Sequence, residues 1–217
     1  SLPGLRTMSW THFISLPCAS PANVRKLNQY IDGVKAHPPA GVVDCVFNNP
    51  AQLHISVAML MLNTEAERRL AHQVLQGMQA EIQLLLEGVA LQVQLKGLKP
   101  RDQGADVASL TILYHRVEEV GGGNRLQALC DLLVARFQEA GLPGKYQNLE
   151  ALHATFLNTR KNRFVPIDAT TLVQAQAPDL MVTVPSVHIS CMGTPGTKSV
   201  GDLRGYFYWI STVPLPA

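Results

Sequence analysis

The sequence predicts a mixed α/β fold of the α+β type, in which two similar lobes share one sheet-rich interface. Short strand patterns alternate with helical patterns along most of the chain, which is typical of this class. The order strand, helix, strand and then a histidine motif occurs twice at nearly the same spacing. The chain has 217 residues and is 47% hydrophobic, so it can bury a substantial core.

The first lobe begins with a strand over residues 11–17. Ser20 and Pro21 then provide an N-cap and a first-turn proline for a helix that ends before the "HPPAG" stretch at 37–41. The apolar stripe of this helix consists of Val24, Leu27, Ile31 and Val34. The spacing of the stripe predicts one buried face.

A second strand, "LHISVAML" at 53–60, completes the first strand-helix-strand unit. Thr64 and Glu67 predict a capping box at the start of one long helix whose apolar stripe extends to Leu85. Residues 91–98 alternate apolar and polar side chains, which predicts another strand.

The second lobe repeats this order from residue 110. A strand is expected over 110–118, and Asn124 stands where it can cap a helix that Gly141 ends. The strand "LHATFLN" follows at 152–158. The remaining expectations are a helix over 168–177 and strands over 180–193 and 206–213.

The internal repeat is supported by spacing rather than by residue identity. Thr11 precedes His54 by 43 residues, and Thr111 precedes His153 by 42. Both intervals end in the pattern H-x-[ST], which indicates a weak duplication. His12 and His115 then take corresponding places in the first strand of each lobe, where we expect structural roles.

The domain organisation follows from this duplication. We expect residues 11–213 to form a single two-lobed domain, with residues 1–10 as a tail or linker from a missing upstream region. The four cysteines form no close pair, so neither a zinc ribbon nor a disulfide framework is expected. The net charge of +2 gives no strong overall attraction for polyanions, and no apolar run approaches the roughly 20 residues of a membrane span.

The two H-x-[ST] motifs are the candidate functional residues. Alternation along a strand puts His54 and Ser56 on one face, and it does the same for His153 and Thr155. If the repeat folds with twofold pseudo-symmetry, the two pairs face each other across a cleft. One imidazole can then remove a proton from an attacking oxygen while the other protonates the leaving oxygen, and the hydroxyls can hold a phosphate group.

These motifs carry a family resemblance over residues 11–213. The stretches "QLHISVAML" (52–60), "GNRLQALCDLLVARFQEAGL" (123–142), "LHATFLNT" (152–159) and "SVHIS" (186–190) resemble the two-histidine, LigT-like phosphoesterase superfamily. Within it, they are similar to the phosphoesterase-like domains of activating signal cointegrator complexes.

The resemblance implies a bilobal fold with helices outside and a central cleft. It implies that His54 and His153 are catalytic, that Ser56 and Thr155 bind phosphate, and that no metal or other cofactor is required. It further implies an RNA or nucleotide phosphate ligand, a helicase-containing signal cointegrator complex as partner, and a nuclear location with roles in transcription coactivation and alkylation-damage repair. An RNA-binding KH domain precedes this region in relatives, but its GxxG signature does not occur upstream of residue 11. We expect a monomer in isolation.

Other residues are weaker candidates. Arg160, Lys161 and Arg163 directly follow the second motif strand and can meet a phosphate backbone, although an ordinary solvated loop would have the same composition. Tyr114 is a candidate for the rim of the cleft. A third H-x-S pattern at His188 lacks the strand-helix-strand lead-in of the other two, and we expect it to be structural or to rim the cleft.

Three functions remain open from the sequence. The first is a metal-independent phosphodiesterase or nuclease that acts on RNA ends or cyclic phosphates. The second is a module that binds a nucleotide or an RNA end without cleaving it. The third is a scaffold subunit that recruits partners through its outer surface.

Overall fold

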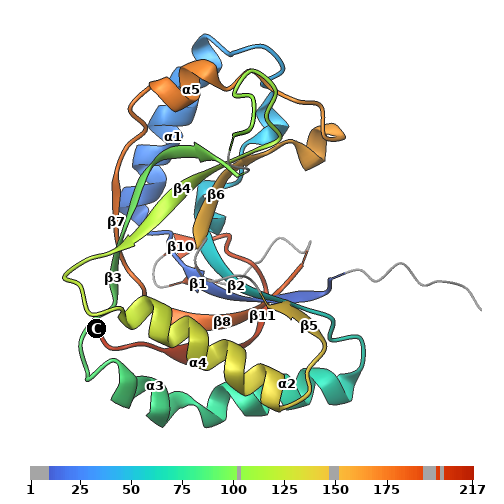
Figure 1. Cartoon of the computed structure of the whole chain (residues 1–217), viewed down its shortest axis with the longest axis vertical. Coiled ribbons are helices and arrows are strands. Elements are labelled where there is room, and N and C mark those ends of the chain that lie inside the picture. The colour runs from blue at the N-terminus through green and yellow to red at the C-terminus, as the bar shows by residue number, and fades with distance from the viewer. Residues whose placement is uncertain (1–9, 102–103, 147–151, 193–198, 201–202) are drawn as a thin grey trace, which may run out of the picture.

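The computed structural model describes residues 10–101, 104–146, 152–192, 199–200 and 203–217. Residues 1–9, which make up most of the expected tail, lie outside the described residues. Within the described part, nine strands form one curled antiparallel sheet, with helices on its outer side (Figure 1). No helix in these ranges is both long enough and apolar enough to cross a bilayer. The predicted α+β fold class is confirmed.

The strands of this sheet follow the order β11-β8-β1-β2-β6-β4-β3-β7, and β5 pairs with the end of β2. Their bounds are β1 His12–Pro17, β2 His54–Leu60, β3 Gln92–Pro100, β4 Ile112–Glu119, β5 Gly144–Tyr146, β6 His153–Asn158, β7 Leu180–Thr183, β8 Ser186–Cys191 and β11 Trp209–Pro214. A separate pair is formed by β9 Ser199–Val200 and β10 Leu203–Arg204.

The α-helices are α1 Pro21–Ala36, α2 Glu65–Gly77, α3 Gln79–Leu85, α4 Arg125–Glu139 and α5 Thr170–Gln174. Short 3-10 turns are η1 Asp44–Val46, η2 Pro50–Gln52 and η4 Thr159–Asn162.

The duplication extends to the hydrogen-bond register. The β1–β2 ladder shifts between Ile14 and Ser15, and the β4–β6 ladder shifts between Leu113 and Tyr114. These breaks are 99 residues apart, as are the two motif histidines, so one offset relates both strand pairs. The expectation that His115 corresponds to His12 is therefore wrong, because this offset gives His115 the place of Leu16.

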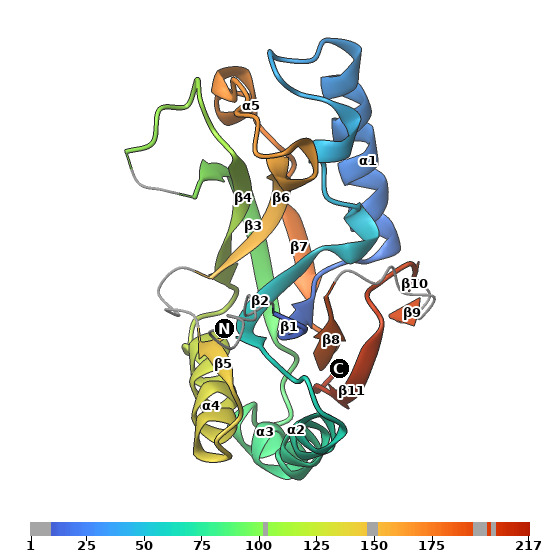
Figure 2. The ribbon, with the colours of Figure 1, turned by 90° about the vertical axis from the view of Figure 1, so that its right-hand side faces the viewer.

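Each lobe is covered by the helix that follows a strand of the other lobe (Figure 2). Helix α1 follows β1, yet its Asn23 side chain donates to the Met181 carbonyl of β7 at 3.0 Å. Helix α4 follows β4, yet it packs on β2 and against α2 and α3. This exchange ties the two lobes together through two buried helix–sheet contacts.

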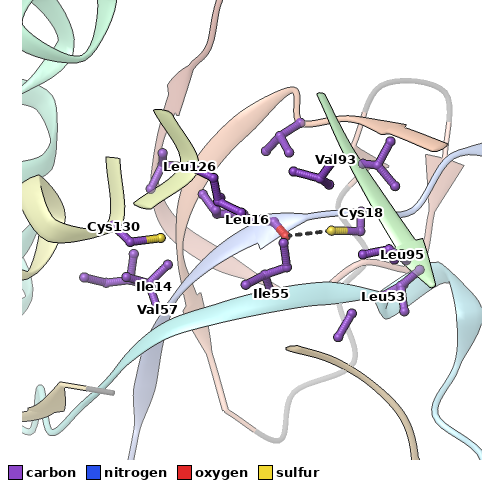
Figure 3. Packing of buried hydrophobic residues seen from close by; sticks show 14 of the residues in the cluster. Ile14, Leu16, Cys18, Leu53, Ile55, Val57, Val93, Leu95, Leu126 and Cys130 are labelled. Carbon is purple, nitrogen blue, oxygen red and sulfur yellow. Dashed lines mark hydrogen bonds between the residues drawn. The ribbon is translucent and has the colours of Figure 1, made fainter. Parts of the chain in front are cut away.

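The core lies between these helices and the outer face of the sheet. Figure 3 shows Ile14, Ile55 and Val57 of the first lobe beside Leu126 and Cys130 of α4. Cys18 lies in the same core, where its thiol donates to the carbonyl of Leu16. Of the four free thiols, Cys18 and Cys130 are buried as expected, whereas Cys45 is exposed.

Local capping agrees with the sequence at two helices and differs at a third. Ser20 caps α1, and Thr64 and Glu67 form the predicted capping box of α2. Asn124 precedes α4 but adopts a left-handed conformation and makes no capping hydrogen bond. The Glu119 carboxylate at the end of β4 instead accepts from the Leu126 amide at 2.9 Å.

Several predicted elements have different bounds. The single long helix is interrupted at Met78, directly after Gly77, because glycine weakens a helix interior. Residues 180–193 contain two strands separated around Pro185, which cannot donate to a ladder. The last strand begins at Trp209 rather than at residue 206, and the expected helix over 168–177 is the shorter α5.

Candidate functional site

The two motif strands are neighbours at the centre of the sheet. Ile55 of β2 lies directly opposite Ala154 of β6, and both side chains are buried. Helix α4 packs on β2, and Phe156 of β6 meets Tyr30 of α1 with ring centroids 5.8 Å apart. Because side chains alternate along a strand, the motif residues on either side of this pair point to the opposite, helix-free face.

The register brings all four motif side chains together. Continuing the Ile55–Ala154 pairing sets His54 opposite Thr155. The same register sets Ser56 opposite His153. The two histidines are thus diagonal neighbours, with about 7 Å between their Cβ atoms. A single phosphate group lies within reach of both imidazoles at this separation.

Hydrogen bonds assign the tautomer of His54. Its Nδ1 lies 2.7 Å from the Gln52 carbonyl oxygen, which can only accept, so Nδ1 carries the proton. Its Nε2 is then an acceptor, and it lies 3.1 Å from Ser56 Oγ. The lone pair of Nε2 therefore accepts from the Ser56 hydroxyl, and it becomes available as a base once that hydroxyl turns to donate to a bound phosphate.

Burial keeps His54 neutral. Its pKa is lowered to about 4, chiefly by burial and further by the charge of His153, whereas the hydrogen bond to Gln52 opposes the shift. Two aromatic rings account for much of this apolar environment. The Phe13 and Phe207 ring centroids lie 5.0 Å and 5.2 Å from that of His54.

His153 has a more polar setting. Tyr114 and Arg116 of β4 lie opposite Thr155 and His153 in the ladder, so both belong to the same face. The Tyr114 and His153 ring centroids are 4.9 Å apart. The Arg116 guanidinium is half-exposed and pairs with Glu118 at 3.1 Å.

The sequence did not single out Arg116 or Phe13, whereas Phe207 belongs to the aromatic run 206–209, which suits either base stacking or a core strand. Arg116 could have been found, because it stands two residues after Tyr114 in a strand pattern and so shares its face. Phe13 gave no such signal, because apolar residues in strands are ordinary core residues.

The remaining candidates differ in position, because His188 lies on the motif face opposite Ser15, which is itself opposite Ser56, whereas the basic residues lie beyond the end of β6. His188 is buried, and its Nε2 shares a hydrogen bond of 2.7 Å with Ser186 Oγ. Its ring packs against that of Trp209, with centroids 4.6 Å apart. Arg160, Lys161 and Arg163 lie on or next to η4, at the other end of β6 from His153. By strand rise, Arg160 is roughly 15 Å beyond Thr155.

This arrangement suits proton transfer around a phosphate. It provides a neutral imidazole, a second imidazole, two hydroxyls and a guanidinium on one face. Among the described residues, no group of three or more His, Cys, Asp or Glu side chains is arranged to hold a metal ion.

Comparisons with known proteins agree with this geometry. Residues 10–199 match the family described as the AKAP7 2′5′ RNA ligase-like domain. Activating signal cointegrator 1 complex subunit 1 from Mus musculus is 32% identical over 157 residues, which are 71% of this chain. The matched region is 44% of that relative, so the chain spans less than half of its length.

The solved structures that match this chain are more distant in sequence. A crystal structure of a phosphoesterase matches with a TM-score of 0.51 at 14% identity, covering 96% of this chain and all of the other. A crystal structure of E. coli LigT complexed with ATP matches with a TM-score of 0.47 at 12% identity, covering 96% of this chain and 99% of the other.

Proposed function

The chain belongs to the AKAP7 2′5′ RNA ligase-like domain family, within the two-histidine phosphoesterase superfamily, and from this premise we propose that it is a metal-independent phosphodiesterase acting on RNA or nucleotides. The observation that supports this most is the register of β2 and β6, which puts His54, Ser56, His153 and Thr155 on one face. We also propose that residues 11–213 act as one two-lobed domain, because each lobe supplies one histidine.

In the proposed reaction, His54 is the base. Its Nε2 lone pair takes the proton from the attacking oxygen, which forms a bond to phosphorus. The bond from phosphorus to the leaving oxygen breaks, and His153 donates a proton to that oxygen. Ser56 and Thr155 donate hydrogen bonds to non-bridging oxygens, where negative charge grows.

Arg116 supports this assignment electrostatically. It lies beside His153 on the motif face, and a guanidinium can hold two phosphate oxygens at once. Tyr114 lies beside Thr155, where its ring can border the bound nucleotide. Both would bind the substrate from the side of β4.

The decisive test is turnover of a 2′,3′-cyclic nucleotide and of short RNA in EDTA. We expect His54→Ala and His153→Ala each to lower kcat about 10²–10⁴-fold with intact folding. Activity that persists in both variants would exclude this mechanism. Tight binding of a nucleoside monophosphate by the unmodified protein with no product would favour a binding module instead.

The cellular setting is a separate proposal that rests on the relative. Because that relative is named as a subunit of the activating signal cointegrator 1 complex, we propose that this chain joins such a complex in the nucleus. Pull-down of the complex from nuclear extract by the tagged chain tests this, and its failure would leave the catalytic proposal unaffected.

A further inference from the structure

A second surface, directly after the end of β6, has no role in the proposed chemistry. It consists of the 3-10 turn η4 and the two residues after it, and we call it the η4 surface, defined by Arg160, Lys161, Arg163 and Phe164. All four side chains are exposed, and Phe164 has 57% of its surface exposed. An exposed ring beside three cations combines a stacking surface with phosphate contacts, which makes this turn a candidate ligand site.

The backbone holds this surface in an unusual conformation. Arg163 and Phe164 both have positive φ angles, 51° and 59°, which are uncommon for residues with a Cβ. The turn is fixed by hydrogen bonds from the Phe164 amide to the Thr159 carbonyl and from the Val165 amide to the Asn162 carbonyl. Strain of this kind persists where the surrounding structure enforces it, and it presents the Phe164 ring to solvent.

The charges of the η4 surface are available to a ligand. Within the described residues, none of its three cations forms an ion pair. The neighbouring turn η1 carries Asp44, but that carboxylate pairs with Lys35 at 3.4 Å. Three free cations beside an exposed ring match the composition of sites that bind single-stranded nucleic acid by phosphate contacts and base stacking.

The position of the surface directly after β6 defines its relation to the motif face. The same strand carries His153 and Thr155 at one end and leads directly into η4 at the other. The roughly 15 Å between Thr155 and Arg160 exceeds the size of one nucleotide but suits a short strand that follows β6. The two sites are therefore ordered along one path.

We propose that the η4 surface binds the body of a single-stranded RNA whose terminal phosphate lies at the histidines. The inference rests on the proposed function and adds its substrate class, namely an oligonucleotide strand rather than a mononucleotide. Arg160 and Lys161 contact backbone phosphates, and Phe164 stacks on a base.

The test compares hexauridylate with cyclic uridine monophosphate. Binding of the labelled hexamer is measured by fluorescence anisotropy across a salt series, and turnover of the mononucleotide is measured in parallel. We expect Arg160→Gln/Lys161→Gln to weaken hexamer binding about tenfold and to reduce the salt slope by about 1.4, since each single-strand phosphate contact contributes about 0.7. Phe164→Asn should weaken hexamer binding about tenfold through lost stacking, and asparagine tolerates the positive φ at this position.

The control is Arg25→Gln/Lys26→Gln on α1, which removes the same charge from an exposed pair on the outside of the molecule. This control and both η4 variants should turn over the mononucleotide as the unmodified protein does, which also verifies folding. Unchanged hexamer binding in both η4 variants would overturn the inference. Hexamer binding that depends on the η4 surface, without turnover of the mononucleotide by the unmodified protein, would instead contradict only the proposed function.

Discussion

The lobe around His54 and the lobe around His153 share a backbone and differ in the side chains that flank each histidine. Their ladders shift at equivalent points, Ile14/Ser15 and Leu113/Tyr114. On β1, the strand that pairs with the other edge of β2, Pro17 lies directly opposite His54. The equivalent position beside His153 holds Arg116. The equivalent ladders therefore hold the two imidazoles in similar backbone geometry, whereas different flanking residues give them distinct surroundings.

The difference indicates how a symmetric frame can separate a base from an acid. His54 lies among Phe13, Phe207 and Pro17, and burial lowers its pKa to about 4. A histidine with that pKa is neutral at pH 7, as a base must be. His153 lies beside a guanidinium and a phenol, which suit contact with a charged phosphate.

The largest expected effect comes from removing the charge that distinguishes the second lobe. Arg116→Gln should lower kcat/KM about 100-fold on a cyclic nucleotide, because a charge-assisted contact to phosphate is lost. Steady-state kinetics measures this. Arg69→Gln, an exposed position on α2, is the matched control and should have no effect. Equal rates for both variants would show that the asymmetry has no role in binding phosphate.

A smaller effect is expected at His115, the buried histidine of the second lobe that takes the place held by Leu16 in the first lobe. His115 is fully buried, and within the described residues neither ring nitrogen makes a hydrogen bond of good geometry, although the Gly97 backbone lies near enough to oppose part of the pKa shift. Burial lowers its pKa to about 4. His115→Leu, which restores the equivalence, should raise the free energy of unfolding at pH 7 by about 1–2 kcal/mol.

The pH dependence of that gain has a defined sign. An unfolded histidine has a pKa near 6.5, so between about 4 and 6.5 the unfolded chain binds more protons than the folded chain. The stability of the unmodified protein falls as pH decreases through this window, and the advantage of His115→Leu grows. Urea unfolding at pH 7 and pH 5 measures it. A smaller advantage at pH 5 than at pH 7 would contradict the assignment.

The smallest expected effect concerns the aromatic wall of His54. Phe207→Ser admits water to the imidazole and should raise the pKa of His54 from about 4 by about one unit. The acid limb of the pH–rate profile should shift to higher pH by the same amount, because His54 must be neutral to act as a base. NMR titration of the His54 ring checks the pKa directly. Phe137→Leu, buried in α4, is a core change that should leave that pKa in place.

The sequence alone determined the elements and the pairing of functional side chains. Alternation fixed the shared face of His54 and Ser56, and the repeat indicated that a second such pair exists. Capping at Ser20 and Thr64 was also readable, since caps depend on residues a few positions apart. These features are local, so spacing along the chain is sufficient to predict them.

Tertiary structure decided which strands meet and what surrounds each histidine. The pairing of β2 with β6 joins residues 99 positions apart, and the packing of α1 and α4 on each other's lobes chooses the covered face. The apolar wall from Phe207 and the guanidinium of Arg116 reach the histidines across ladders and loops. Burial and cross-strand neighbours set the pKa and the charge of the site, and both depend on long-range packing that residue spacing does not encode.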